Sequence, residues 1–167
     1  MPTTYEPIAT QTLGSAAATI TFSSIPSTYT DLRLVLTAVA NSSTIGAYII
    51  YNNDSGANYS WTNLRGNGTT AASSVIGPAT QINLAFFSSA TTTIPAFYTA
   101  DIFSYAGSTN KTCLTTASAD QNGSGLVERH VGLWRSTSAI NRLDIYTNAV
   151  ANFGIGTTAT LYGIKNA

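Results

Sequence analysis

Apolar and polar residues alternate over many short segments of this chain, and that period of two constrains the fold more than any other feature. Successive side chains of a strand point to opposite faces, whereas a helix repeats every 3.6 residues. Leu32, Leu34 and Leu36 share one side of the strongest segment, and Val35 lies on the other side, which is typical of a central strand. No segment keeps a helical period over several turns. We therefore expect strands and little helix.

About ten segments carry this pattern, with clusters of Gly, Ser, Thr and Asn between them. They are 18–22, 31–40, 45–51, 59–64, 81–87, 96–105, 111–119, 126–134, 142–147 and 157–164. We expect an all-β fold, a single jelly-roll-like β-sandwich of about ten strands that forms one domain over 1–167. Residues 65–77 are predicted to be a long loop. Residues 1–12, which include Pro2 and Pro7, are predicted to form an N-terminal arm that leaves the body.

Charged residues are unusually few. They make up 8% of the chain, against about 25% in an average soluble domain. Seven basic residues balance seven acidic ones, which leaves no basic surface for nucleic acid and no polybasic patch for a membrane. No apolar run approaches the roughly 20 residues of a transmembrane helix. We expect no nucleic-acid or membrane partner, synthesis in a cytoplasm, and a surface that neighbours cover in an assembly.

Residues that usually carry chemistry are also scarce. His130 is the single histidine and Cys113 the single cysteine, so neither a two-histidine metal site nor a thiolate zinc cluster can form. We expect Cys113 to fill the interior of a strand. His130 alternates with Glu128 on one strand face, which we expect to be half solvated. No catalytic, cofactor or metal-binding residues are expected.

The carboxylates need separate consideration, because a glycosidase requires only two of them about 5–10 Å apart in a cleft. Asp101 is the first candidate, since it lies in an otherwise apolar strand. The alternative is a buried ion pair between Asp101 and an arginine, with Arg33, Arg129 and Arg142 as candidates. Asp54 lies among oxygen-rich residues, but their spacing is not that of a calcium loop, and a solvated turn is expected there.

The aromatic residues are more informative. Nine tyrosines and two tryptophans with few charges are typical of protein interfaces and of surfaces that stack on carbohydrate. Tyr5 and Ile8 are expected to be apolar anchors of the N-terminal arm, and four further aromatic residues are expected to be exposed. The candidate intermolecular contacts are Tyr5, Ile8, Tyr29, Tyr48, Tyr59 and Trp61.

Four segments resemble a known family. They are the opening MPTTYEPIAT, the segment FSSIPSTYTDLR at 22–33, the segment GLWRSTSAI at 132–140 and the ending LYGIK at 161–165. Together they are similar to virion structural proteins of tailed bacteriophages, including capsid cement or decoration proteins and fibre or tail-associated proteins. The resemblance implies a trimeric β-sandwich and no catalytic residues.

On this resemblance we expect a protein without enzymatic activity on the capsid surface of a virion, made in the host bacterial cytoplasm. As a homotrimer it would bind the major capsid protein and stabilise the assembled shell. The alternative is a receptor-binding fibre or tail module that recognises a host surface glycan. An enzyme that cleaves polysaccharide is a third class. Copy number in the particle separates the first two, with hundreds of copies expected for a cement protein.

Overall fold

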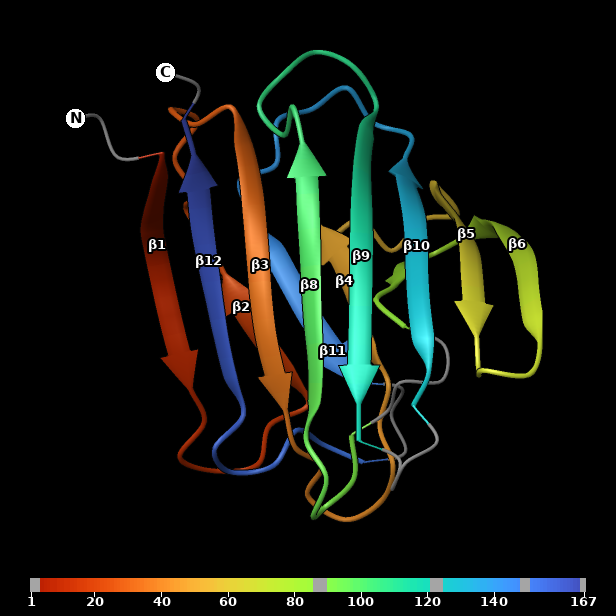
Figure 1. Ribbon diagram of the computed structural model, residues 1–167. Helices are drawn as coiled ribbons and strands as arrows, with labels where there is room; N and C mark the ends of the chain where they lie inside the picture. The colour runs from red at the N-terminus through yellow and green to blue at the C-terminus, as the bar shows by residue number, and fades with distance from the viewer. Residues whose placement is uncertain (1–3, 86–89, 121–124, 148–150, 166–167) are drawn as a thin grey trace.

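The computed structural model describes residues 4–85, 90–120, 125–147 and 151–165. These residues form twelve strands and no helix, in two antiparallel sheets (Figure 1). The predicted all-β class is therefore confirmed, and the two sheets are consistent with a β-sandwich. No helix in the described ranges is long and apolar enough to cross a membrane.

The two sheets differ in width. The large sheet has the spatial order β1 (Tyr5–Thr12), β12 (Thr158–Ile164), β3 (Asp31–Ala38), β8 (Ala96–Phe103), β9 (Lys111–Ala119), β10 (Val127–Trp134), β5 (Tyr59–Gly66) and β6 (Ala71–Ala79). The small sheet has the order β2 (Thr19–Phe22), β11 (Leu143–Thr147), β4 (Ala47–Tyr51) and β7 (Ile82–Asn83). Eight strands thus face only four, and the large sheet extends beyond the small one (Figure 1).

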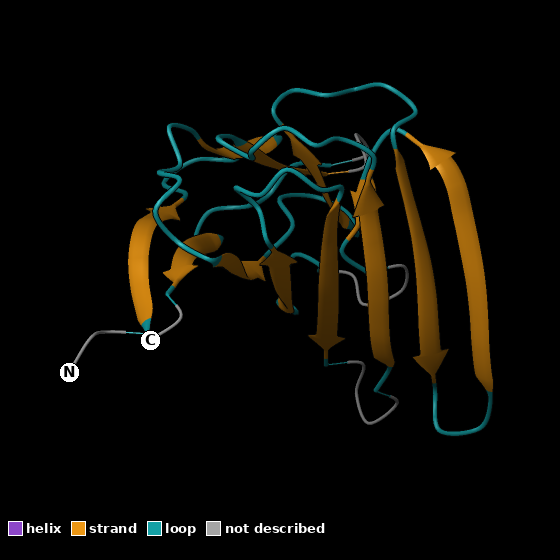
Figure 2. Cartoon of the chain, turned by 90° about the horizontal axis from the view of Figure 1, so that it is seen from above, coloured by secondary structure: helices purple, strands orange, loops and turns teal. Residues whose placement is uncertain are grey.

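The chain passes repeatedly between the sheets. The strands from β1 to β4 alternate between the large and the small sheet, and the chain returns from β11 to β12 in the same way. The order β1-β12-β3-β8 opposite β2-β11-β4-β7 favours the jelly-roll variant, which stays a prediction. Seen from above, the strands at the β6 end are viewed lengthwise and those at the β1 end are foreshortened, because strand twist accumulates across the sheet (Figure 2).

The core lies between the sheets and follows from the period of two. Leu32, Leu34 and Leu36 on β3 are fully buried and belong to one apolar cluster with Ile49 of β4 and Ile145 of β11. Burying a side chain of this size contributes about 1.5–3 kcal/mol. The small sheet therefore covers the inner side of the central strands of the large sheet.

Close packing also fixes β7 against β10. Gly132 lies on the inner face of β10, and a Cβ atom there would stand 2.7 Å from both Cys113 Sγ and Ile82 Cγ2. Because no real Cβ tolerates such a distance, the glycine allows Ile82 to reach the sheet. The segment 81–87 was predicted to be a strand; Ile82–Asn83 is one, and residues 86 and 87 lie outside the described ranges.

Two predictions about the ends of the large sheet are wrong. Residues 5–12 are not an arm but the edge strand β1, which pairs with β12 and has a bulge between Pro7 and Ala9. Proline is tolerated at an edge because its missing N–H faces away from the ladder. Residues 65–77 are not a loop, since Ala71–Ala79 forms the opposite edge strand β6. Its small residues lack a period of two, and backbone pairing with β5 forms the strand.

Candidate functional site

The outer face of the large sheet is turned away from the small sheet and carries exposed side chains of several strands. Cross-strand register places Val75, Thr62, Val131 and Leu114 in one row over β6, β5, β10 and β9. Residues in register share a face of the sheet. Toward the β1 edge this face carries threonine pairs whose hydroxyls are hydrogen-bonded, as in Thr12–Thr158 at 3.1 Å.

Large apolar side chains gather on this face near β6. Val75 is 71% exposed, and Leu64, Val127 and Val131 are exposed beside it. These four residues, Leu64, Val75, Val127 and Val131, are called the outer patch below. Exposed apolar groups gathered in this way mark interaction surfaces more often than scattered ones do. No residue of Ala71–Ala79 is charged, so the edge strand beside the patch has none of the charges that usually protect a sheet edge.

Asp101 lies on the same outer face, and its predicted partner is identified. Arg33 Nε is 3.5 Å from Asp101 Oδ1, and Arg33 Nη1 donates to the Tyr5 hydroxyl at 3.4 Å. Pairing with Arg33 is thus confirmed, but burial of the pair is wrong, because the two side chains are 35% and 28% exposed. Solvent screens such a pair, so it contributes about 0–1 kcal/mol rather than the several kcal/mol of a buried pair.

The six candidate contact residues separate into two groups. Tyr5 is 48% exposed, while Ile8, Tyr29 and Tyr48 are half-buried. A role for these four in intermolecular contacts stays a prediction. The two others, Tyr59 and Trp61, are buried within the chain, so the prediction that they are exposed is wrong. Both lie on the inner face of β5, where the sequence alone does not say which face is covered.

Tyr59 instead helps to hold the turn between β4 and β5. Its ring stacks on Trp134 at a centroid distance of 6.2 Å, and its hydroxyl donates to the backbone oxygen of Asp54 at 3.0 Å. The indole N–H of Trp134 donates to Asp54 Oδ2 at 2.7 Å, and Asn58 Nδ2 donates to both carboxylate oxygens. These bonds lower the pKa of Asp54, that from Trp134 most strongly. Asp54 is therefore engaged as a structural acceptor in this turn.

His130 and Glu128 do share a strand face, but that face is buried rather than half solvated. Both are fully buried, with His130 Nε2 3.9 Å from Glu128 Oε1. The imidazole stacks on Trp61 at a centroid distance of 5.4 Å. Among the described residues, neither ring nitrogen of His130 has a hydrogen-bond partner. Cys113 is buried as predicted, and burial raises the pKa of its thiol to about 11.

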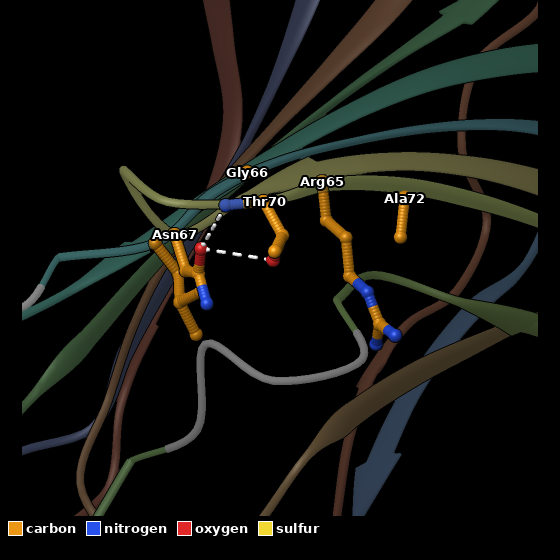
Figure 3. A pocket seen from close by; sticks show the side chains of 6 residues that line it. Arg65, Gly66, Asn67, Thr70 and Ala72 are labelled. Carbon is orange, nitrogen blue, oxygen red and sulfur yellow. Dashed lines mark hydrogen bonds between the residues drawn. The ribbon is translucent and has the colours of Figure 1, made fainter.

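A first cavity, of about 230 Å³, lies at the end of the β5–β6 hairpin (Figure 3). Asn67 Oδ1 accepts hydrogen bonds from the backbone N–H and the hydroxyl of Thr70, which closes the hairpin turn. Arg65 is the one ionisable residue among the described residues of its lining. The volume falls below the roughly 300–1,000 Å³ of typical ligand sites.

A second cavity, of about 610 Å³, lies on the outer face of the small sheet. Tyr146, Gln81 and the ion pair of Arg142 with Asp144 line it. This site was not predicted from the sequence, because its residues come from segments far apart in the chain. The alternation of Leu143 and Ile145 with Asp144 and Tyr146 is a signal that the sequence does offer, since it places a tyrosine on the far side of a strand.

Neither cavity holds the paired carboxylates of a glycosidase. Among the described lining residues, the first has no acidic side chain and the second has Asp144 alone, which Arg142 engages through two hydrogen bonds. No group of three or more His, Cys, Asp or Glu side chains suited to a metal ion occurs in the part of the chain that the structure describes.

The described residues thus define a β-sandwich with two distinct surfaces, an open sheet face that carries the outer patch and a cavity of mixed polar and apolar lining on the opposite side. No protein-family model, curated protein or solved structure matches this chain.

Proposed function

We propose that this chain is a non-enzymatic structural protein of a tailed-bacteriophage virion that binds and stabilises the assembled capsid shell as a homotrimer. The observation that carries the proposal is the outer patch with the adjoining uncharged strand β6. The resemblance of segments at both ends and in the middle of the chain supports the virion class. The low charge supports a surface that neighbouring proteins cover.

The trimer contact is proposed to join the two free edges of the large sheet. A ring of identical subunits needs two different surfaces that fit each other, one on each side of the subunit. Strand β6 offers Val75 and Ile76, which are 71% and 42% exposed, and β1 offers Tyr5 with the half-buried Ile8. Because the chain has no net charge, its copies do not repel one another.

The shell contact is proposed to lie nearer the middle of the outer face. Phe97 and Phe103 on β8 are exposed there and lie away from both free edges. A protein that binds the assembled shell but not its separate subunits stabilises the shell by mass action. Each trimer would present this contact three times to the shell, so a modest affinity of each subunit is sufficient through multivalency.

Light scattering at micromolar concentration tests the trimer. The wild type is expected to be a trimer and the Val75→Lys/Ile76→Lys variant a monomer, because two buried, unpaired ammonium groups oppose the contact. Thr112→Lys/Thr116→Lys is the matched control: it adds the same two charges at exposed positions on β9, away from both edges, and should stay trimeric. A wild type that is monomeric both in solution and in the particle contradicts the trimer.

Shell binding is tested with purified expanded shells that lack the protein. Phe97→Ser should bind at least about tenfold more weakly than the wild type, a loss of about 1.4 kcal/mol. Ile155→Ser removes an apolar side chain that is still more exposed, 70% against 49% for Phe97, from a loop and should bind normally. His130→Ala, if folded, should also bind normally. Copy number by quantitative mass spectrometry completes the test, since tens of copies or fewer would exclude a cement role.

A glycan-binding fibre or tail module is the second candidate function, and the cavity beside Tyr146 favours it. Low copy number together with binding of host surface glycan would support it over the cement role. Incubation of the protein with host envelope polysaccharide separates both from an enzyme. Release of reducing sugar by the wild type would overturn the non-enzymatic assignment.

A further inference from the structure

The cavity on the outer face of the small sheet has the dimensions and lining of a small-molecule site. Its volume of about 610 Å³ falls within the roughly 300–1,000 Å³ typical of ligand pockets. Apolar lining comes from Ile50 and Tyr146, and polar lining from Asn53, Gln81 and Arg142. The site lies on the sheet opposite the outer patch, so a ligand here leaves the proposed trimer and shell contacts free.

An aromatic ring is held in place at this site. Tyr146 stacks on Tyr48 with ring centroids 5.8 Å apart and an angle of 30° between the rings. Its hydroxyl donates a hydrogen bond to Gln81 Oε1 at 2.6 Å. Partial burial raises the pKa of Tyr146 to about 12, so the phenol stays neutral at physiological pH. A fixed, neutral ring suits the apolar C–H face of a sugar, which packs on aromatic rings.

The charged groups of the site cancel each other. Arg142 donates to Asp144 through Nε at 2.7 Å and through Nη2 at 2.8 Å, and Thr21 Oγ1 donates to the same carboxylate at 2.6 Å. The Asp144 side chain is 5% exposed and the Arg142 side chain 36% exposed. The carboxylate is therefore occupied, and an anion gains little from an arginine that is already paired.

Two fixed groups remain to donate hydrogen bonds. Arg142 Nη1 makes no hydrogen bond within the described ranges, although the other two guanidinium nitrogens do. Gln81 Oε1 accepts from Tyr146 and from Thr80 Oγ1, which leaves the amide nitrogen of Gln81 to donate. Preorganised planar donors beside an aromatic ring recognise hydroxyl groups at little entropic cost.

We propose that this cavity binds a neutral saccharide, with the sugar ring against Tyr146 and its hydroxyls accepting hydrogen bonds from Gln81 Nε2 and Arg142 Nη1. The balanced charge excludes phosphate and sulfate groups as the main anchor. This site is independent of the cement role, and it also specifies where the second candidate function would reside.

The test uses the full-length wild-type protein and a panel of neutral and acidic oligosaccharides, with hits measured by calorimetry. Tyr146→Ala should weaken binding at least tenfold, whereas Tyr146→Phe, which keeps the ring, should change it less than about threefold. Gln81→Ala should also weaken binding. Tyr162→Ala, at a half-buried tyrosine on the large sheet, is the control and should bind normally.

Circular dichroism melting confirms that each variant is folded, and Gln81→Ala decides the outcome if Tyr146→Ala does not fold. Three results overturn the proposal. They are no neutral saccharide bound at millimolar concentration, binding of acidic saccharides only, and binding that both Tyr146→Ala and Gln81→Ala leave unchanged. None of these results bears on shell binding, so the two proposals fail separately.

Discussion

Strands β3 and β6 belong to the same sheet and both carry aliphatic side chains, yet one is buried on its inner face and the other is exposed on both faces. Leu34 of β3 has no exposed surface, whereas Val75 and Ile76, on opposite faces of β6, are 71% and 42% exposed. The small sheet covers the inner side of β3 but does not reach β6, at the far right of Figure 1. Alternation thus separates the two faces of a strand, and the second layer decides which face is buried.

The interior changes character between these two strands. The inner face of β3 presents three leucines and an alanine, but beneath β10 and β5 the buried side chains include Glu128, His130 and Asn63. Thr115 on the neighbouring β9 is also buried, and its hydroxyl donates to the Leu84 backbone oxygen at 2.9 Å. The sheet therefore passes from an apolar core, through a polar interior, to an edge available for a partner.

The largest expected effect on stability comes from comparing the buried strand β3 with the exposed edge strand β6. Leu34→Ala should reduce the free energy of unfolding by about 2–5 kcal/mol, because it removes apolar groups that folding transfers from water to the core and it leaves a cavity. Val75→Ala should change the monomer by less than about 0.5 kcal/mol, since its side chain is mostly in water. Urea denaturation at a concentration where the protein is monomeric measures both.

The same two variants should have the opposite order of effects on trimer formation. Val75→Ala should weaken the trimer, and Leu34→Ala, if folded, should leave the contact surface unchanged. Equal losses of monomer stability in the two variants would show that β6 is buried in the free chain and would remove the basis of the contrast.

The polar interior gives the next effect. His130→Ala should cost about 2–4 kcal/mol, because it leaves a cavity beside Trp61. His130→Phe keeps a ring for that stacking contact and removes two nitrogens that have no partner among the described residues, so it should cost less than about 1.5 kcal/mol. Both are measured by denaturation at pH 7. A larger loss for Phe than for Ala would indicate that the nitrogens are hydrogen-bonded, through water or another group.

Much of the covered half of the fold could be predicted from the sequence, because its strands alternate with large residues. Leu32, Leu34 and Leu36 identify β3 directly. Strand β6 was not predicted, because its Ala, Ser and Gly residues do not alternate between apolar and polar. Its hydrogen bonds with β5 are made by the backbone. Local pattern does not report backbone pairing, so such a segment resembles a loop.

The candidate sites were harder to predict than the fold. An ion pair of Asp101 with an arginine was within reach of the sequence, and Arg33 was among the candidates. Burial of Tyr59 and Trp61 could not be predicted from the sequence. Strand β5 has aromatic residues at alternate positions, and nothing local says which of its faces another layer covers. The cavity beside Tyr146 unites β11, β4 and the segment before β7, which only the tertiary fold brings together.

The smallest effect concerns the turn that links the covered strand β4 to β5. Asp54 has a lowered pKa, first because the Trp134 indole donates to it, so its folded value lies below the ordinary value of 3.8. A lowered carboxyl pKa stabilises the folded state fully above the ordinary value, and the contribution is lost as the pH falls through the folded value.

Trp134→Phe should therefore be less stable than the wild type at pH 6, yet lose less further stability on going from pH 6 to pH 2. The difference between the two acid-induced losses should be below about 1 kcal/mol, because Asp54 is partly exposed and solvent screens it. Urea denaturation at both pH values measures it. Asn58→Ala, which removes the weaker side-chain donor, should fall between the two. Equal acid-induced losses in all three proteins would mean that Asp54 does not couple this turn to the aromatic cluster of Tyr51, Tyr59 and Trp134.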